Sequence, residues 1–327
     1  MKKIFFFLFF VGLFFSCGID SSSNDSEKVN YREEMRNFVE SISEYAKDKK
    51  ENFIVITQNG IELITKNGEP DGEIAKDYVD SLDGVAQEDL FYGYENDNEP
   101  TPEEESNYLN DFLKRIKNEG KKVLVVDYCW DKEKIDDSYQ KNESHGYIST
   151  ATCRELDCIP KYPSQPFNVN DDDINSLKDA KNFLYLINPQ NFSTKEEFLE
   201  ALENTDFDIL IIDAFFENQL LASEDVNRLK KKANGGKRLV ISYMSIGEAE
   251  DYRYYWKDEW NDNPPEWLDE ENPDWKGNYK VKYWMKDWQN IIYGNSDSYL
   301  DKILSSGFDG VYLDIIEAFE YFEEKEK

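Results

Sequence analysis

Short runs of apolar residues recur along the chain, and they constrain its fold more than any other feature. Eight such runs read as buried strands, at residues 53–57, 84–91, 123–126, 183–187, 209–212, 239–243, 280–284 and 310–313. Between them lie amphipathic stretches with helical period, at residues 103–118, 193–202, 223–233 and 297–305. Apolar strands that alternate with such helices are typical of a parallel sheet covered by helices. We therefore predict an α/β fold, a single (β/α)8 TIM barrel over residues 31–327.

An open nucleotide-binding sheet is the alternative fold. It requires a Gly-rich phosphate-binding turn after a strand, and neither G-x-G-x-x-G nor a P-loop occurs. Eight repeats therefore favour the closed barrel. The stretch from Tyr31 to Tyr45 has apolar residues at helical spacing, and we expect it to close the barrel floor. Ser193 and Ser223 are predicted helix N-caps.

The first residues have the pattern of a lipoprotein signal. Two lysines precede an apolar run from Ile4 to Phe15, which is too short to span a bilayer and stops at Ser16-Cys17. We predict a signal peptide over residues 1–16, lipidation of Cys17 and a flexible tether over residues 17–30. The protein is then membrane-anchored and extracytoplasmic, either periplasmic or at the cell surface. A plain cleaved signal or an uncleaved anchor is the alternative.

The charge balance restricts the partners. There are 38 basic and 69 acidic residues, so the net charge is −31. Such a field repels polyanions, which excludes nucleic acid as a partner, and it attracts cations, including cationic polymers. Alternatively, the acids only keep the surface soluble. We expect a monomer.

The cysteines and the single histidine give weak support to a metal site. Beyond Cys17 only Cys129, Cys153 and Cys158 remain, so at most one pair can form a disulfide. A Cys153–Cys158 disulfide or free thiols are favoured over a zinc site with His145, because no close C-x2-C pair is present. His145 is predicted to lie in a polar loop. We predict neither a metal nor a cofactor.

Acidic residues follow five of the predicted strands. Asp127, Asp213 and Asp314 come directly after strands three, five and eight, and Glu248 and Asp287 lie just past strands six and seven. Loops at these carboxyl ends carry the chemistry of a barrel enzyme, although each acid alone also fits a helix N-cap. Glycoside cleavage needs two carboxyls, and crowding raises their pKa values. We predict Asp314 and Glu248 as the catalytic pair, and their separation by strand seven favours the wide spacing of an inverting enzyme.

Six of the seven tryptophans lie between residues 256 and 288. Aromatic rings stack on the apolar faces of sugars, so we assign Trp256 and Trp284, together with Tyr243 and Tyr312, to substrate binding. The alternative is that the tryptophans build a small core for a long loop.

Two segments resemble a known family. The sequence from Ser242 to Trp256, SYMSIGEAEDYRYYW, and the sequence from Gly307 to Asp314, GFDGVYLD, followed by Glu317-Ala318-Phe319-Glu320, resemble glycoside hydrolase family 114. More narrowly, they are similar to its bacterial and archaeal extracellular branch of endo-α-1,4-polygalactosaminidases, from about Phe53 to Phe322. The resemblance implies a (β/α)8 barrel that hydrolyses an α-1,4-linked galactosamine polymer, which is partly cationic.

The chain departs from the family pattern in its last strand. The resemblance leads us to expect Glu where this chain has Tyr312, and Asp where it has Glu317. This branch must then use another carboxyl pair or act on another sugar. We expect Asp127, Asp213, Asp287 and Glu317 to tune pKa values or to hold the sugar, and Arg253 to orient a carboxylate.

Two other functions remain open. One is a non-catalytic carbohydrate- or peptidoglycan-binding lipoprotein on a barrel scaffold. The other is a hydrolase whose acids bind Mg²⁺ or Ca²⁺, although no loop has EF-hand spacing.

Overall fold

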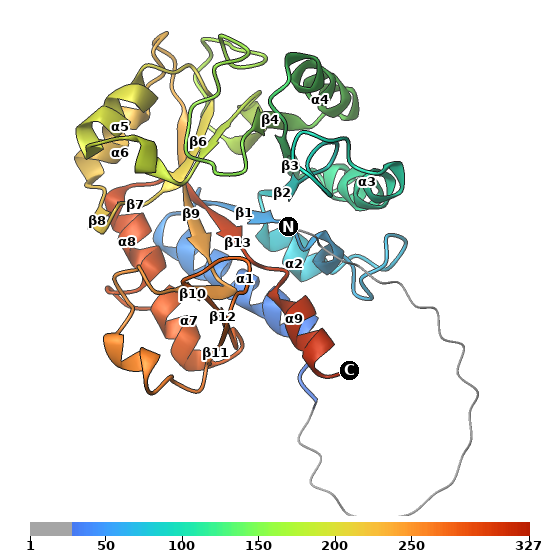
Figure 1. Ribbon diagram of the computed structural model, residues 1–327, viewed down its shortest axis with the longest axis vertical. Coiled ribbons are helices and arrows are strands. Elements are labelled where there is room, and N and C mark those ends of the chain that lie inside the picture. Colours follow the sequence, from blue (N-terminus) through green and yellow to red (C-terminus); the bar gives the residue numbers. More distant parts are fainter. Residues whose placement is uncertain (1–27) are drawn as a thin grey trace, which may run out of the picture.

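The structure is a computed structural model, and it describes residues 28–327 (Figure 1). The predicted signal peptide, the lipidation at Cys17 and most of the tether lie outside the described residues. Lys28 is paired with Glu326 at 3.1 Å. The side chain of Asn30 accepts a hydrogen bond from the Glu33 N–H and so caps the first helix, α1 (Tyr31–Lys49).

Eight parallel strands form a nearly closed barrel with helices between them, which confirms the predicted (β/α)8 fold. The strands follow the order β4-β3-β2-β1-β13-β9-β6-β5. Within residues 28–327 no strand pairing joins β4 to β5, and this seam interrupts the ring. The barrel strands are β1 (Ile54–Gln58), β2 (Gly84–Glu88), β3 (Lys122–Tyr128), β4 (Ile148–Thr152), β5 (Leu184–Leu186), β6 (Ile209–Asp213), β9 (Leu239–Ser245) and β13 (Gly310–Asp314).

The barrel differs from the prediction in one strand. The predicted strand at residues 280–284 is wrong, because that region forms β12 (Asn278–Val281), which pairs antiparallel with β10 (Glu248–Glu250) and β11 (Leu268–Glu271). In Figure 1 this side sheet lies beside α7 (Lys286–Ile292). The missing strand is β4, whose sequence ISTAT is buried throughout but too polar to be recognised as an apolar run.

This change makes β9 and β13 direct neighbours. Tyr243 pairs with Tyr312, and Ser245 pairs with Asp314. The strand that was expected between Glu248 and Asp314 is therefore absent from that place. A small two-stranded sheet, β7 (Phe215–Phe216) with β8 (Gln219–Leu220), follows β6.

The helices pack around the barrel. Thr194, and not Ser193, caps the helix after β5, and Ser223 is the first residue of its helix rather than the cap. His145 is the last residue of a helix and not part of a loop. The remaining helices are α2 (Lys76–Ser81), α3 (Glu103–Asn118), α4 (Lys132–His145), α5 (Lys195–Glu203), α6 (Ser223–Leu229), α8 (Tyr299–Ser306) and α9 (Ala318–Lys325).

Side chains that alternate along the strands fill the barrel interior. They form one buried cluster that is rich in isoleucine and leucine and includes the tyrosines Tyr128, Tyr185, Tyr243 and Tyr312. A second and larger cluster lies between the strands and the helices. Among residues 28–327 no helix is both long and apolar enough to span a bilayer.

Candidate active site

Three neighbouring strands end in polar side chains that point into the barrel. The residues two positions earlier, Ile56 on β1, Ala86 on β2 and Tyr312 on β13, belong to the interior cluster. Strand side chains alternate, so the terminal residues face inward as well. These terminal residues are Gln58, Glu88 and Asp314.

The chain turns sharply after each of these three residues. A positive φ is uncommon for residues other than glycine, and for β-branched Ile315 it is an outlier. Strained positions of this kind cluster at functional sites. The residues concerned are Asn59 (φ 57°), Asp89 (φ 58°) and Ile315 (φ 60°).

Asp314 has the most perturbed carboxyl of this group. Its exposed fraction is 8%, and it accepts a hydrogen bond of 2.7 Å from the Tyr243 hydroxyl. Burial raises the pKa of Asp314 to about 7, the charge of Glu88 and to a lesser extent that of Glu248 add to this, and the Tyr243 hydrogen bond opposes it. Near neutral pH this carboxyl therefore exists in both protonated and ionised forms.

Glu88 is a candidate site residue that the sequence analysis did not predict. It is partly buried, and it accepts hydrogen bonds from the Asn59 side chain at 2.8 Å and from the Tyr128 hydroxyl. The predicted strand ran on to Phe91 and so hid the point where β2 ends. The available signal was the pair Glu88-Asp89 inside an otherwise weak apolar run.

Glu248 lies on β10, at the same end of the barrel as Asp314. Its exposed fraction is 1%, and its Oε1 accepts hydrogen bonds from Lys280 Nζ at 2.5 Å and from Asn272 Nδ2 at 2.7 Å. Lys280 is its register partner on β12. The carboxylate thus ties the strands of the side sheet together, and its charge is matched within that sheet.

Arg253 joins two further carboxylates. It contacts Asp213 at the end of β6 at 2.7 Å and Glu250 on β10 at 2.6 Å. The Tyr252 hydroxyl donates to Glu250 at 2.5 Å. Burial raises the pKa of Asp213, and the Arg253 charge opposes this rise. The arginine therefore fixes the side sheet to the end of β6.

The other predicted acids lie in different surroundings. Asp127 is fully buried and accepts hydrogen bonds from the backbone of Phe91 and Tyr92 and from the side chains of Ser138 and Asn142, which ties α4 to the loop after β2.

Asp287 is exposed in the first turn of α7. The reason for placing it at the barrel mouth fails, because residues 280–284 are not a barrel strand. Glu317 is the N-cap residue of α9, three residues past the end of β13.

Most of the tryptophans pack on one another. Ring centroids are 5.3 Å apart for Trp256 and Trp260, 5.1 Å for Trp260 and Trp267, and 5.0 Å for Trp267 and Trp288. Trp284 instead packs between α1 and α9, 5.0 Å from Tyr31 and 4.7 Å from Phe322. These contacts match the alternative in which the rings form a small core. Trp130 and Trp275 are more than half exposed.

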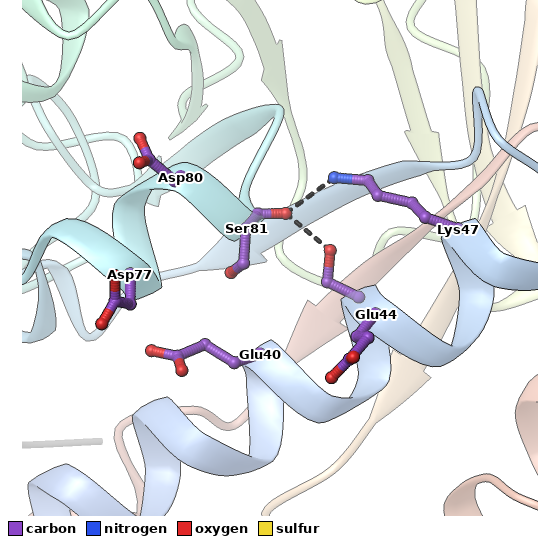
Figure 2. Close-up of a pocket in the computed structure, with 7 residues that line it drawn as sticks. Glu40, Glu44, Lys47, Asp77, Asp80 and Ser81 are labelled. Carbon is purple, nitrogen blue, oxygen red and sulfur yellow. Dashed lines mark hydrogen bonds between the residues drawn. The ribbon is translucent and has the colours of Figure 1, made fainter.

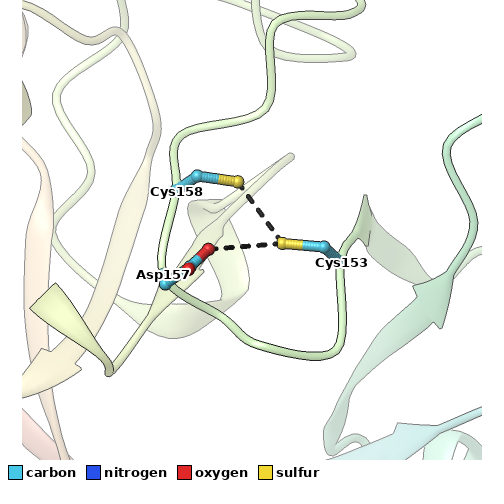
Figure 3. Close-up of side chains that lie close together, drawn as sticks. All are labelled: Cys153, Asp157 and Cys158. Atoms are coloured by element: carbon cyan, nitrogen blue, oxygen red, sulfur yellow. Dashed lines mark hydrogen bonds between the residues drawn. The ribbon is translucent and has the colours of Figure 1, made fainter. Parts of the chain in front are cut away.

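Two of the cysteines lie side by side in the loop after β4 (Figure 3). Their sulfur atoms are 3.3 Å apart, and Asp157 lies 3.6 Å from Cys153 Sγ. Cys153, Asp157 and Cys158 form a group of potential metal ligands within 4.8 Å of one another. Neither Cys129 nor His145 belongs to it.

A hollow of about 350 Å³ lies at the opposite end of the barrel (Figure 2). Glu40 and Glu44 on α1 and Asp77 and Asp80 on α2 line it. Since α1 and α2 lead into the amino ends of β1 and β2, this hollow faces away from Asp314 and Glu88.

Comparisons with known proteins bear on the second half of the barrel. Residues 176–326 match the sequence model of glycoside-hydrolase family GH114. The predicted resemblance is thereby confirmed over these residues. They include β5, β6, β9, the side sheet and β13, but not β2 with Glu88.

Several relatives are similar to part of the chain. An uncharacterized protein of Methanocaldococcus jannaschii is 40% identical over 160 residues, which cover 46% of this chain and 44% of the relative. An uncharacterized protein of Thermotoga maritima is 39% identical over 41% of this chain and 42% of the relative. A third, from Deinococcus radiodurans, is 37% identical over 37% of each chain. The similarity thus spans less than half the length of each of these relatives.

Proposed function

We propose, from the match of residues 176–326 to glycoside hydrolase family 114, that the protein is an extracytoplasmic endo-glycosidase of galactosamine-containing polysaccharides. The observation that carries the reaction class is Asp314. It is a buried carboxyl at the carboxyl end of a barrel strand, and burial together with the charges of Glu88 and Glu248 raises its pKa to about 7. A glycosidase needs such a group to hold a proton at neutral pH and to release it to a leaving oxygen.

The substrate class rests on charge. The resemblance implies a polymer of α-1,4-linked galactosamine whose free amines are cationic, and the net charge of −31 attracts a cationic chain. Lipidation at Cys17 would hold the enzyme at a membrane surface facing such a polymer. Intact-mass measurement of the protein from its native membrane tests the lipid directly.

Product release is the decisive experiment. Purified protein is incubated with partly deacetylated α-1,4-galactosamine polymer and with neutral polysaccharides, and soluble oligomers are identified by mass spectrometry. We expect oligomers from the amino-sugar polymer only, in the presence of EDTA as well as in its absence. Binding without oligomer release would support the non-catalytic carbohydrate-binding alternative, and loss of release in EDTA would support the metal-dependent one.

A matched pair of variants ties the activity to the site. Asp314→Asn removes the proton donor, and we expect turnover to fall by about 10²- to 10⁴-fold. Asp111→Asn is the control, since Asp111 is an exposed aspartate on α3. Equal activity of both variants would show that Asp314 is not the proton donor.

A further inference from the structure

Asp314 requires a second carboxylate, and two acids raise its pKa. Glu88 has the larger influence and Glu248 the smaller. The two acids differ in whether a positively charged side chain is bound to them. Glu248 forms an ion pair with Lys280, whereas the donors that bind Glu88 are the neutral side chains of Asn59 and Tyr128.

The strand order places Glu88 and Asp314 across a gap of one strand. β2 and β13 both pair with β1, so their backbones are separated by two strand spacings, roughly 9.5 Å. Both side chains point inward from the last residue of their strands. An inward separation of this kind leaves room between the carboxyls for a sugar carbon and a water.

A buried hydroxyl without a partner lies near both acids. Tyr312 is fully buried in the barrel interior, and among residues 28–327 its Oη has no hydrogen-bond partner. Tyr312 lies two residues before Asp314 on β13, so both side chains point into the barrel. Burial raises the pKa of Tyr312, and the charges of Glu88 and Asp314 raise it further. A buried hydroxyl costs free energy unless it is hydrogen-bonded, so this one is suited to bind a ligand or a water.

We propose that Glu88 is the catalytic partner of Asp314, that Tyr312 donates a hydrogen bond to the water or sugar held between them, and that Glu248 is a positioning residue. This inference rests on the proposed glycosidase function. Glu88 lies outside the part of the chain that matches the family, so the match does not assign it a role.

The roles of the two carboxyls follow from their surroundings. Asp314 gives its proton to the glycosidic oxygen as the bond from that oxygen to C1 breaks. Ionised Glu88 takes a proton from the water whose oxygen forms the new bond to C1. One water is consumed, and exchange with solvent then returns a proton to Asp314 and removes the proton that Glu88 accepted. Glu248 keeps β10 and β12 in register beside Asp314 through Lys280.

The test compares Glu88→Gln with Glu248→Gln in the full protein, with Asp111→Asn as the control. Two galactosamine oligomers serve as substrates, the natural one and an aryl glycoside whose phenolate leaves without a proton donor. We expect Glu88→Gln to lower kcat by about 10³-fold on both substrates, and Asp314→Asn to lower it on the natural oligomer only. Glu248→Gln should lower kcat by about tenfold or less and should lower the unfolding temperature.

A chemical rescue keeps the proposal testable if a variant is poorly folded. Azide can replace water in Glu88→Ala because it needs no base, so a glycosyl azide should form from the aryl glycoside. Tyr312→Phe should lower kcat by about tenfold while the unfolding temperature stays the same or rises, because it removes an unpaired buried hydroxyl.

The outcomes separate the two proposals. If the wild-type protein releases no product, the glycosidase proposal fails, and this inference fails with it. If the wild type is active while Glu88→Gln retains its kcat, the glycosidase stands and the role of Glu88 is overturned. A 10³-fold loss in Glu248→Gln, with azide rescue of Glu248→Ala, would instead restore the Asp314–Glu248 pair.

Discussion

The proton on Asp314 contributes to the stability of the fold as well as to the reaction. Its pKa is about 7 in the folded protein, against 3.8 for an aspartate in an unfolded chain, so between these values the folded chain binds more protons than the unfolded chain. The contribution of Asp314 to the free energy of unfolding therefore falls as pH rises from about 4 to 7, and then levels off.

Asp314→Asn should for this reason be more stable than the wild type at pH 8, by up to about 4 kcal/mol, and equally stable near pH 4. Urea unfolding at the two pH values measures the difference. A variant less stable at pH 8 would show that the ionised carboxylate is stabilised by its neighbours.

The hydrogen bond from Tyr243 also affects the pKa of Asp314, in the direction opposite to burial. The Tyr243 hydroxyl stabilises the ionised form of Asp314 and so lowers the pKa of that carboxyl. In Tyr243→Phe the pKa of Asp314 should rise, and the alkaline limb of the kcat profile should move to higher pH. The pH dependence of product release checks this, and an unchanged or acid-shifted limb would contradict the role of Asp314 as proton donor.

At the scale of elements, the loop after β4 is constrained by its two cysteines. We predict that Cys153 and Cys158 form a disulfide in an oxidising compartment, each thiol losing a proton and an electron to a disulfide oxidoreductase. Alkylation followed by mass spectrometry should find the two residues linked and Cys129 free. The link should stabilise the fold by about 2 kcal/mol, since the loop is short. Full alkylation of all three cysteines without reductant would contradict the prediction.

The junction of β9 and β10 is packed too tightly for a side chain. A Cβ on Gly247 would lie 2.0 Å from the Ile315 carbonyl oxygen, which belongs to the backbone directly after Asp314. Gly247→Ala should cost about 1–3 kcal/mol of stability and should lower kcat, because it displaces the backbone beside the reacting carboxyl. Chemical unfolding and turnover test both effects together, and a fully active, equally stable variant would show that the two segments can separate freely.

The sequence predicted the elements that have a strong apolar pattern. It did not predict elements whose buried residues are polar. Helix α3 was placed at its exact bounds, because its apolar residues follow the helical period. Strand β4 was missed because Ser149, Thr150 and Thr152 are buried polar residues. The prediction counted an apolar segment of the side sheet as a barrel strand instead, and so it placed a strand between β9 and β13. The main consequence of this error was a wrong expected position of Glu248 relative to Asp314, because the pairing and register of strands cannot be read from the sequence.

At the scale of the whole molecule, the acidic charge should govern the approach of substrate. With a net charge of −31, attraction to a cationic polymer weakens as salt screens it. KM for the deacetylated polymer should therefore rise between roughly 0.05 and 0.5 M NaCl, while kcat changes little. Fully acetylated polymer is the neutral control. A KM for the cationic polymer that is independent of salt would show that charge has no part in recognition.

The seam between β4 and β5 makes the barrel a split ring. Among residues 28–327, the backbone hydrogen bonds that cross it run from the N–H groups of Ile187 and Asn188 to the single carbonyl of Leu156. Elsewhere in the barrel each strand is held to its neighbours by a ladder of backbone hydrogen bonds, so the seam is the line with the fewest such bonds to break. Deuterium should therefore enter the amides of β4 and β5 beside the seam before it enters those of the strands that are paired on both sides.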